Sequence, residues 1–528
     1  MRELINKCPT GFLFICSLAL SSGVLFYRLG ELSIDCWDEA RLANNALEMA
    51  NSGGLSLVTT YDGSPDHWNT KPPLVIWLMS LSIAFFGSSE LSVRIPSVMA
   101  AMATIIMVFA FAAYYLKRPL IGFLSVLILL CIRAYIHLHG ARSGNYDSVL
   151  TLWTTGYLLS GYLYLKDTDH RMLWLSLCML GILLAFFTKT AQGLIFAPAL
   201  IIYALYKRQY FVLKSALVYF YGILILAICA AYYLLRNQID PGYLDSAILN
   251  DLLGRFATVI ENHVGGPFYY FEPKWVILTV GIIGFQFMSR NHSELREFSV
   301  FLGMMFLFYL LIISSASTKI AWYVVPLSSL ASMLIAIAFY QLAKDKLFKI
   351  TLPRVRPGLI IFPAVIFVSF LVFAFNFREI ENQEMSSKNL VADQYNYFLR
   401  SKFVQSGQIP KFAVVHPSYY DTSFYIAPAL FYVNTLRKKG LKITVLQVDD
   451  AVPEDYQYLL LCGEKIKNRM ETRFSLQAID TDGQCGMYMI EKTRDSAKQD
   501  MKRPASRAPE TGWGLAGFPG SRNWPFNS

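Results

Sequence analysis

The chain has 528 residues, of which 55% are hydrophobic and 16% are charged, and its formal net charge is +10. Soluble globular proteins carry about 25% charged residues, so this composition excludes an ordinary soluble protein and indicates a polytopic membrane protein. The basic residues mostly lie between apolar runs and form no compact basic face, which argues against nucleic-acid binding.

Eleven apolar runs recur along the chain, and most are long enough to cross about 30 Å of hydrocarbon. Basic clusters separate alternate runs, for example at Lys117 and Arg118, and the positive-inside rule places these clusters in the cytoplasm. This threading predicts eleven crossings, with the N-terminus inside and the C-terminus outside. The runs lie near 11–27, 95–116, 119–136, 148–165, 172–187, 191–206, 215–235, 275–288, 298–316, 320–343 and 357–377.

A further apolar run, at 72–87, is short and begins with two prolines. The threading holds only if this run lies at the membrane interface, so we predict a long outer loop at 29–94. The first run follows Arg2 and Lys7 and has features of a signal peptide. The many later spans favour a retained first helix instead.

The character of the sequence changes after about residue 380. The segments "KFAVVHP", "LKITVLQVDD", "YQYLLLCG" and "GMYMIEK" predict short β-strands, and "NQEMSSKNLVADQYNYFLRSKF" predicts an amphipathic helix. We therefore predict a membrane domain at 1–379, a small soluble α/β domain at 380–493 and a disordered tail at 494–528. Cys462 and Cys485 either pair, if this domain faces an oxidising compartment, or stay free.

With this threading, polar residues from five outer loops gather on one side of the membrane. Each has a simpler explanation: Asp38 and Asp147 can cap helices, Lys71 can extend along an interface, and His263 can be satisfied within its loop. Together they favour a site. The residues are Asp35, Asp38, Glu39, Lys71, Arg142, Asp147, Lys189, Glu261, His263, Lys319 and Tyr323.

The chemistry of this set is specific. A carboxylate can activate a hydroxyl by general-base catalysis, and Asp38 is our candidate for that base. Four cations, Lys71, Arg142, Lys189 and Lys319, can neutralise a phosphate. A cavity rich in Phe and Tyr can hold an isoprenoid tail. The set predicts transfer of a sugar from a lipid phosphate to an acceptor at the outer face.

Several segments resemble a known group. "DEARLANNALEMANSGG", "TKPPL", "FGSSELSVRIPS" and "ARSGNYDSVLTL" are similar to segments of membrane glycosyltransferases of the GT-C fold, and "HVGGPFYY" and "STKIAWYVVPL" continue the likeness. The most similar branch includes the lipid A aminoarabinose transferases and the protein O-mannosyltransferases. The resemblance covers roughly residues 10–345 and implies interfacial helices in the first outer loop.

The resemblance also implies roles. It suggests a polyprenyl-phosphate sugar donor, inversion at the sugar carbon, Asp38, Glu39 and Asp147 as catalytic residues, and Lys71 as a phosphate ligand. We add Arg142, His263, Lys319 and Tyr323 as candidate substrate-binding residues. An acid often precedes the Lys-Pro pair in the aminoarabinose branch, whereas this chain has Thr70, so a divalent cation stays an open question and no other cofactor is expected.

The sequence thus predicts an inverting glycosyltransferase in the bacterial inner membrane with its active site on the periplasmic face. Its expected partners are the lipid-linked donor, membrane lipids and a lipid, glycan or protein acceptor. The alternative is a transporter or flippase of lipid-linked sugars, which would place ionisable groups in the middle of the membrane. A third class, a structural or sensory protein that binds cell-wall glycan, leaves Asp38, Lys71 and Asp147 without a shared role.

Overall fold

The computed structural model describes residues 10–137, 139–252, 254–260, 263–288, 293–347, 358–388, 391–417 and 426–493. The predicted tail at 494–528 and the predicted site residue Glu261 lie outside these ranges. The chain divides into two compact units. We call residues up to 29 together with 48–379 the helical unit, and residues 30–47 together with those from 380 the sheet unit.

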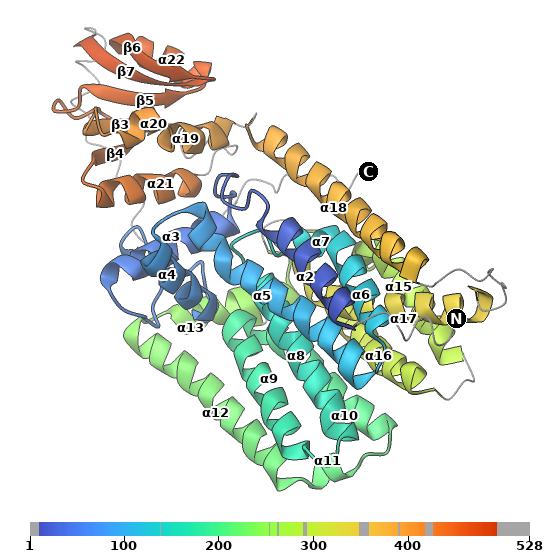
Figure 1. The fold of residues 1–528 in the computed structure, drawn as a ribbon. Coiled ribbons are helices and arrows are strands. Elements are labelled where there is room, and N and C mark those ends of the chain that lie inside the picture. Colours follow the sequence, from blue (N-terminus) through green and yellow to red (C-terminus); the bar gives the residue numbers. More distant parts are fainter. Residues whose placement is uncertain are drawn as a thin grey trace. The chain divides into compact units, whose positions relative to one another are not determined.

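The helical unit confirms the predicted helical fold, because a helix covers every one of the eleven apolar runs (Figure 1). Among the described residues, six helices are long and apolar enough to cross a membrane: 90–115, 171–194, 216–239, 294–315, 321–342 and 363–383. The helices over the runs are α2 (Thr10–Phe26), α5 (Glu90–Ala110), α6 (Pro119–Cys131), α8 (Asp147–Lys166), α9 (Arg171–Leu194), α10 (Phe196–Tyr206), α12 (Ala216–Ile239), α15 (Lys274–Met288), α16 (Glu294–Ser315), α17 (Ser328–Leu347) and α18 (Gly358–Lys388).

Shorter elements connect these helices. The run at 72–87 forms α4 (Leu74–Phe86), which begins after Pro73 and ends at Gly87. Its position at the interface stays a prediction. The others are β1 (Thr60–Tyr61), β2 (Ser64–Pro65), η1 (Phe111–Tyr115), α7 (Arg133–Ile136), α11 (Phe211–Lys214), α13 (Tyr243–Ala247), η2 (Ile248–Leu252), α14 (Gly254–Ala257), η3 (Tyr269–Phe271) and η4 (Ala321–Leu327).

Local chemistry explains several helix ends. Ser89 caps α5 by accepting from the Ser92 amide, while the Ser92 hydroxyl closes a capping box. Ser293 caps α16 in the same way through the Arg296 amide. Pro119 is the first residue of α6, where its missing N–H costs nothing. These starts fix where each apolar segment begins.

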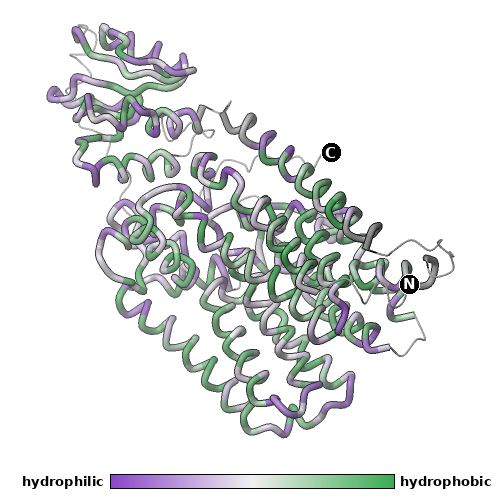
Figure 2. Tube along the Cα trace, viewed as in Figure 1, coloured by the Kyte–Doolittle hydropathy of each residue, from purple (hydrophilic) through white to green (hydrophobic). Residues whose placement is uncertain are grey.

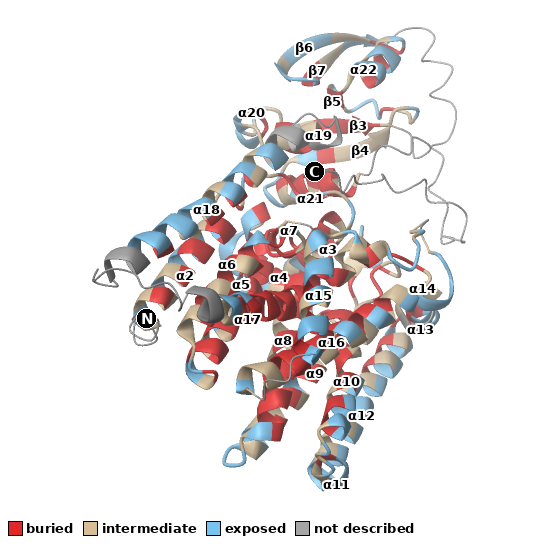
Figure 3. Ribbon diagram, turned by 90° about the vertical axis from the view of Figure 1, so that its right-hand side faces the viewer, coloured by how far each residue is buried: buried red, intermediate tan, exposed pale blue. Residues whose placement is uncertain are grey.

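The core of the helical unit is built around α8, which packs against α5 and α9. Figure 2 shows hydrophobic residues along most of these helices, as a membrane span requires. Figure 3 shows the difference between inner and outer helices: α8 is largely buried, whereas α12 and α18 expose many apolar side chains. Exposed apolar helix faces of this kind suit contact with lipid.

A break interrupts α9 near its C-terminal end. Lys189 has φ −152° and ψ 48°, and Thr190 has φ 39° and ψ −122°, so neither residue is helical. A β-branched residue with positive φ is rare, and the surrounding structure must hold it there. The break turns the Lys189 side chain away from the regular helical path, and its consequence is seen at the site below.

The sheet unit contains a mixed five-stranded sheet in the order β4-β3-β5-β7-β6. β3 is parallel to β4 and β5, and β7 is antiparallel to β5 and β6. Cys462 and Cys485 face each other across β5 and β7 and form a disulfide. The elements are α19 (Val391–Leu399), α20 (Lys402–Gln405), β3 (Lys411–His416), α21 (Ala427–Lys438), β4 (Lys442–Gln447), β5 (Tyr458–Cys462), α22 (Glu464–Glu471), β6 (Phe474–Asp482) and β7 (Cys485–Thr493).

Two details differ from the sequence predictions. The single amphipathic helix expected at 382–403 is divided, because α18 continues to Lys388 and α19 is a separate helix. β6 was absent from the predicted strands. Its burial pattern is mostly exposed after Phe474, so it lacks the dense apolar signal of the inner strands.

Residues 30–47 are expected from the sequence to belong with the membrane domain, but they group with the sheet unit. The Ile34 amide donates to the Tyr432 hydroxyl at 2.8 Å, and the Asn44 side chain donates to the Ala427 carbonyl at 2.9 Å. Arg400 adds bonds to the carbonyls of Gly30 and Glu31. These hydrogen bonds attach the start of α3 (Asp38–Ser52) to α21 and to the end of α19.

Candidate active site

A buried ion pair joins α8 to the break in α9. Asp147 is the first residue of α8, and its Oδ1 lies 2.7 Å from Lys189 Nζ. The two side chains are 2% and 6% exposed. The Tyr323 ring centroid lies 5.3 Å from the same ammonium. Burying two charges is costly unless they pair closely, so this contact holds both groups in place.

A second charged pair lies in the loop before α4. Lys71 Nζ is 3.6 Å from Asp251 Oδ1, and the Thr70 hydroxyl donates to the other oxygen of the same carboxylate. The Lys71 ammonium lies 5.5 Å from the Tyr146 ring centroid. The Tyr146 hydroxyl in turn donates to the Asn69 side chain at 2.7 Å. The loop that carries Lys71 is therefore connected to the residue immediately before α8.

The two pairs share one electrostatic environment. Burial raises the pKa of Asp251, but the charges of Lys71 and Arg255, the Thr70 hydrogen bond and the charge of Lys189 outweigh it, so the pKa lies below its usual value. Asp251 is therefore ionised at neutral pH. Cations and carboxylates from three separate parts of the chain thus act on one another at this position.

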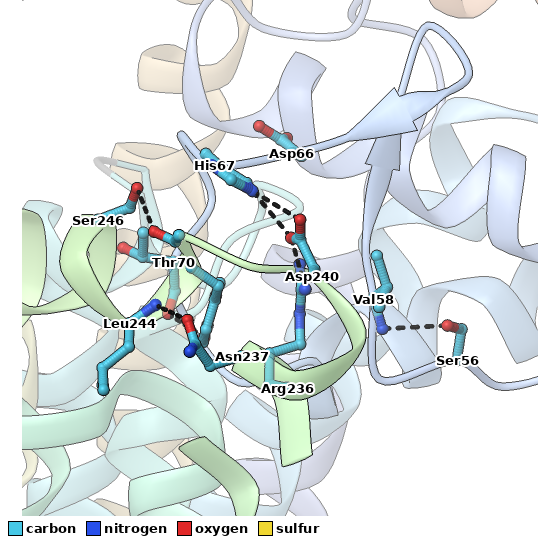
Figure 4. A network of polar contacts seen from close by, with 12 residues as sticks. Ser56, Val58, Asp66, His67, Thr70, Arg236, Asn237, Asp240, Leu244 and Ser246 are labelled. Carbon is cyan, nitrogen blue, oxygen red and sulfur yellow. Dashed lines mark hydrogen bonds and ion pairs between the residues drawn. The ribbon is translucent and has the colours of Figure 1, made fainter. Parts of the chain in front are cut away.

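A polar network anchors the same loop to the end of α12 (Figure 4). His67 Nε2 lies 2.9 Å from both carboxylate oxygens of Asp240, and Arg236 donates to Asp240 at 2.6 Å. Burial raises the pKa of Asp240, but the bonds and charges of His67 and Arg236 lower it overall. The Tyr243 hydroxyl donates to the Thr70 carbonyl at 2.6 Å. Thr70 is therefore held through its backbone as well as its side chain.

The two later motifs pack together although they are distant in sequence. The Lys319 amide donates to the His263 carbonyl at 2.9 Å, and Thr318 bonds the backbone at Thr258 and Ile260. A Cβ at Gly265 would lie 2.8 Å from Lys319 Cγ, so glycine permits this close approach. The motifs "HVGGPFYY" and "STKIAWYVVPL" thus form one structural feature.

The remaining predicted substrate ligands have defined surroundings. Lys319 Nζ donates to the carbonyls of Ser314 and Ala316 at the end of α16, and burial lowers its pKa. The His263 ring centroid lies 6.3 Å from that of Trp322. Arg142 donates to the carbonyls of Val24 and Leu25 at the end of α2. In this structure Lys319 and Arg142 therefore satisfy helix C-termini, and a role in phosphate binding stays a prediction for both.

The first-loop acids belong to the sheet unit. Asp38 begins α3 and is partly exposed, whereas Glu39 is buried, with 1% of its surface exposed. Glu39 Oε2 accepts from the Asp35 amide at 2.7 Å, which holds the turn before the helix. Glu39 thus supports the helix start, and the Asp38 side chain is partly exposed. The catalytic role of Asp38 stays a prediction.

Several residues of the cluster were not predicted from the sequence. These residues are Asp251, which contacts Lys71 and Thr70, and the pair Asp240 and Arg236, which holds His67. One available signal was the single acid in the mostly apolar segment "ILNDLLGRFA". Within the described ranges, His, Cys, Asp and Glu side chains do not gather in groups of three that would suit a metal ion.

Comparison with known proteins places these observations in a family context. Residues 70–234 match the family described as dolichyl-phosphate-mannose-protein mannosyltransferase. The structure is similar to the crystal structure of ArnT from Cupriavidus metallidurans bound to undecaprenyl phosphate, with a TM-score of 0.68 and 15% sequence identity. The superposition covers 91% of this chain and 98% of the ArnT chain. The chain has the GT-C fold. The resemblance predicted from the sequence is confirmed.

Sequence relatives point to the same fold family. An undecaprenyl phosphate-alpha-4-amino-4-deoxy-L-arabinose arabinosyl transferase of Pseudomonas savastanoi pv. phaseolicola is 24% identical over 62% of this chain and 61% of its own length. The arabinosyl transferase 2 of Proteus mirabilis is 24% identical over 57% and 54%. An uncharacterized protein of Aquifex aeolicus is 25% identical over 57% and 58%. This GT-C chain thus spans between about half and two thirds of each relative's length.

Proposed function

We propose that the protein transfers a sugar from a polyprenyl-phosphate-linked donor to a hydroxyl on a glycolipid, a glycan or a protein. The observation that carries this proposal is the pair of charged contacts, Lys71–Asp251 and Asp147–Lys189, in a chain with the GT-C fold. Several relatives are named as undecaprenyl-phosphate-dependent arabinosyl transferases, which supports a lipid-phosphate donor. The fold itself does not specify the sugar or the acceptor.

In the proposed reaction the acceptor oxygen attacks the anomeric carbon of the sugar. The bond between that carbon and the phosphate oxygen breaks, and polyprenyl phosphate leaves with the bonding electrons. The acceptor proton passes to Asp38, our candidate base. Attack opposite to the leaving group inverts the configuration at the anomeric carbon.

The cations have a separate role in this scheme. Lys71 binds the phosphate of the donor, and its positive charge stabilises the negative charge that develops on the leaving group. Lys189 is occupied by Asp147 at 2.7 Å, so it acts first on the position of α8 and only secondarily on the phosphate. Tyr323, whose ring centroid lies 5.3 Å from the Lys189 ammonium, is our candidate for a further contact with the donor.

A transporter of lipid-linked sugars is the alternative expected from the sequence, and none of the named relatives supports it. A transporter would be expected to place ionisable groups in the middle of the membrane. A reconstitution in nanodiscs separates the two functions, because nanodiscs have no closed compartment to transport into. Release of polyprenyl phosphate that requires both donor and acceptor supports a transferase. Lack of release with a broad panel of acceptors, together with donor movement in sealed vesicles, would favour transport.

We also propose that the site lies on the periplasmic face of the bacterial inner membrane. The Cys462–Cys485 disulfide supports this orientation for the sheet unit, since disulfides persist in oxidising compartments. The test is labelling with a membrane-impermeant maleimide after the other free cysteines are replaced by serine. Lys465→Cys should label from outside, and Thr168→Cys, in the loop between α8 and α9, should label only after permeabilisation. The reverse pattern would overturn the orientation.

A further inference from the structure

Asp251 makes two contacts with adjacent residues of the first loop. One carboxylate oxygen accepts a hydrogen bond from the Thr70 hydroxyl, and the other lies 3.6 Å from the Lys71 ammonium. The side chains of Lys71 and Asp251 are 18% and 9% exposed, so water screens this attraction only partly. A single carboxylate therefore constrains both the residue that carries the cation and its neighbour.

The segment that carries Asp251 is itself fixed against the same loop. Asp251 lies in η2, which directly follows α13. The Tyr243 hydroxyl, from α13, donates to the Thr70 carbonyl at 2.6 Å and also bonds the Tyr232 hydroxyl at 2.9 Å. The Tyr243–Thr70 bond and the Thr70–Asp251 bond thus join this segment to Thr70 at two points. The position of Asp251 relative to Lys71 is therefore well defined.

The charges around Asp251 are nearly balanced. Lys71, Lys189 and Arg255 act on it as cations, and Asp147 pairs with Lys189. Among these five described groups, three cations and two carboxylates leave one net positive charge. A phosphodiester that links a sugar to a lipid carries one negative charge, so the cluster would become neutral when such a donor binds.

We propose that Asp251 is a positioning residue for the donor phosphate: it holds the Lys71 ammonium where the phosphate binds. This inference rests on the proposed function. Asp251 does not contact the reacting atoms in this scheme. It reduces the number of orientations that the flexible lysine side chain can adopt, and so reduces the entropy that donor binding must overcome.

The direction in which Asp251→Asn changes the donor KM shows whether Asp251 positions Lys71 or is a carboxylate without a role in donor binding. Asn keeps an acceptor for the Thr70 hydroxyl but loses the charge that restrains Lys71. We expect the KM for a polyprenyl-phosphate sugar to rise about 10- to 100-fold, with kcat changed much less. A bystander carboxylate would have the opposite effect, because its removal strengthens anion binding. An unchanged or lowered KM would therefore overturn the inference.

A double-variant cycle tests whether the carboxylate itself is what Lys71 requires. Asp251→Ala removes it, and Thr70→Glu supplies one from the residue adjacent to Lys71. Each single variant should raise the donor KM, the second because two acids then compete for one lysine. The double variant should recover at least about tenfold relative to Asp251→Ala. If the variants remain folded in detergent and the donor KM of the double variant is as high as the two single effects combined, the inference is contradicted.

The matched control is Asp245→Asn, which neutralises an exposed acid in α13 of the same segment. Its donor KM should stay at the wild-type value. The activity of the wild-type protein distinguishes a failure of this inference from a failure of the proposed function. If the wild type releases no polyprenyl phosphate with any donor, the proposed function fails. If the wild type is active and Asp251→Asn binds the donor normally, only the role of Asp251 fails.

Discussion

The ion pair between Asp147 and Lys189 allows a structural role to be separated from a chemical one. Lys189→Met keeps most of the length of the side chain and removes the charge. The partner carboxylate, 2% exposed and formerly 2.7 Å from the ammonium, would then be buried without its counter-charge. Breaking a buried pair in this way costs about 3–5 kcal/mol, so we expect a loss of that order in the free energy of unfolding.

Asp147→Asn should cost a similar amount, because it removes the carboxylate charge 2.7 Å from the buried lysine ammonium. The double variant, Asp147→Asn with Lys189→Met, has no buried charge at this position and should recover most of the stability. Unfolding can be followed by tryptophan fluorescence during titration of the micelles with SDS. Turnover is then measured on the variants that fold.

The double variant decides the role of Asp147. If the carboxylate takes part in the chemistry, the double variant is stable but inactive. If Asp147 only anchors α8 to the break in α9, activity returns together with stability. A Lys189→Met protein within about 0.5 kcal/mol of the wild type would refute the reasoning, since a change that small is typical of exposed positions.

Three further predictions concern other residues of the site. Lys71→Ala should weaken donor binding by about 30- to 1000-fold and Lys71→Arg should restore part of it; unchanged affinity by calorimetry would leave Lys71 with only an interfacial role. Asp38→Asn should keep the fold, because Asn caps helices about as well as Asp, but lose about 10²- to 10⁴-fold in turnover. Wild-type turnover in a stable Asn variant would make Asp38 a helix cap. Gly265→Ala should reduce activity and thermal stability, because its Cβ would lie 2.8 Å from Lys319 Cγ and 2.7 Å from a Tyr269 ring carbon, whereas Gly266→Ala, with no atom within 4 Å, should behave as wild type. Equal effects of the two alanines would show that the packing at 265 is not what matters.

The sequence predicted the helices well because their signal is local and strong. Each long apolar run forms a helix. Pro119 begins α6 and Gly87 ends α4, as the sequence predicted. The strand β6 was not predicted because its alternating apolar pattern is weak. The helix predicted at 382–403 was not expected to continue from the last apolar run, but α18 joins the two up to Lys388, because helix-forming residues follow the apolar run without a break.

The site was predictable in part for the same reason. Lys71, Asp147, Lys189 and Lys319 are conspicuous because ionisable residues are rare beside apolar runs. Which of these side chains pair with one another could not be predicted from the sequence, because the pairs depend on tertiary structure. Thr70 and Asp251 are 181 residues apart, and no local pattern around Asp251 indicates that the two side chains meet.

The hydrogen bonds that join residues 255–260 and residue 263 to residues 317–319 have a consequence for biosynthesis. Thr258 and its partner Thr318 are separated by 60 positions, with α15 and α16 between them. At translation rates of about 5–20 residues per second, Thr258 emerges roughly 3–12 s before Thr318. During that interval its backbone groups must be satisfied by water, lipid headgroups or the insertion machinery. The pairing is therefore a late step of assembly, and Lys319 can reach its final position only after both intervening helices have been synthesised.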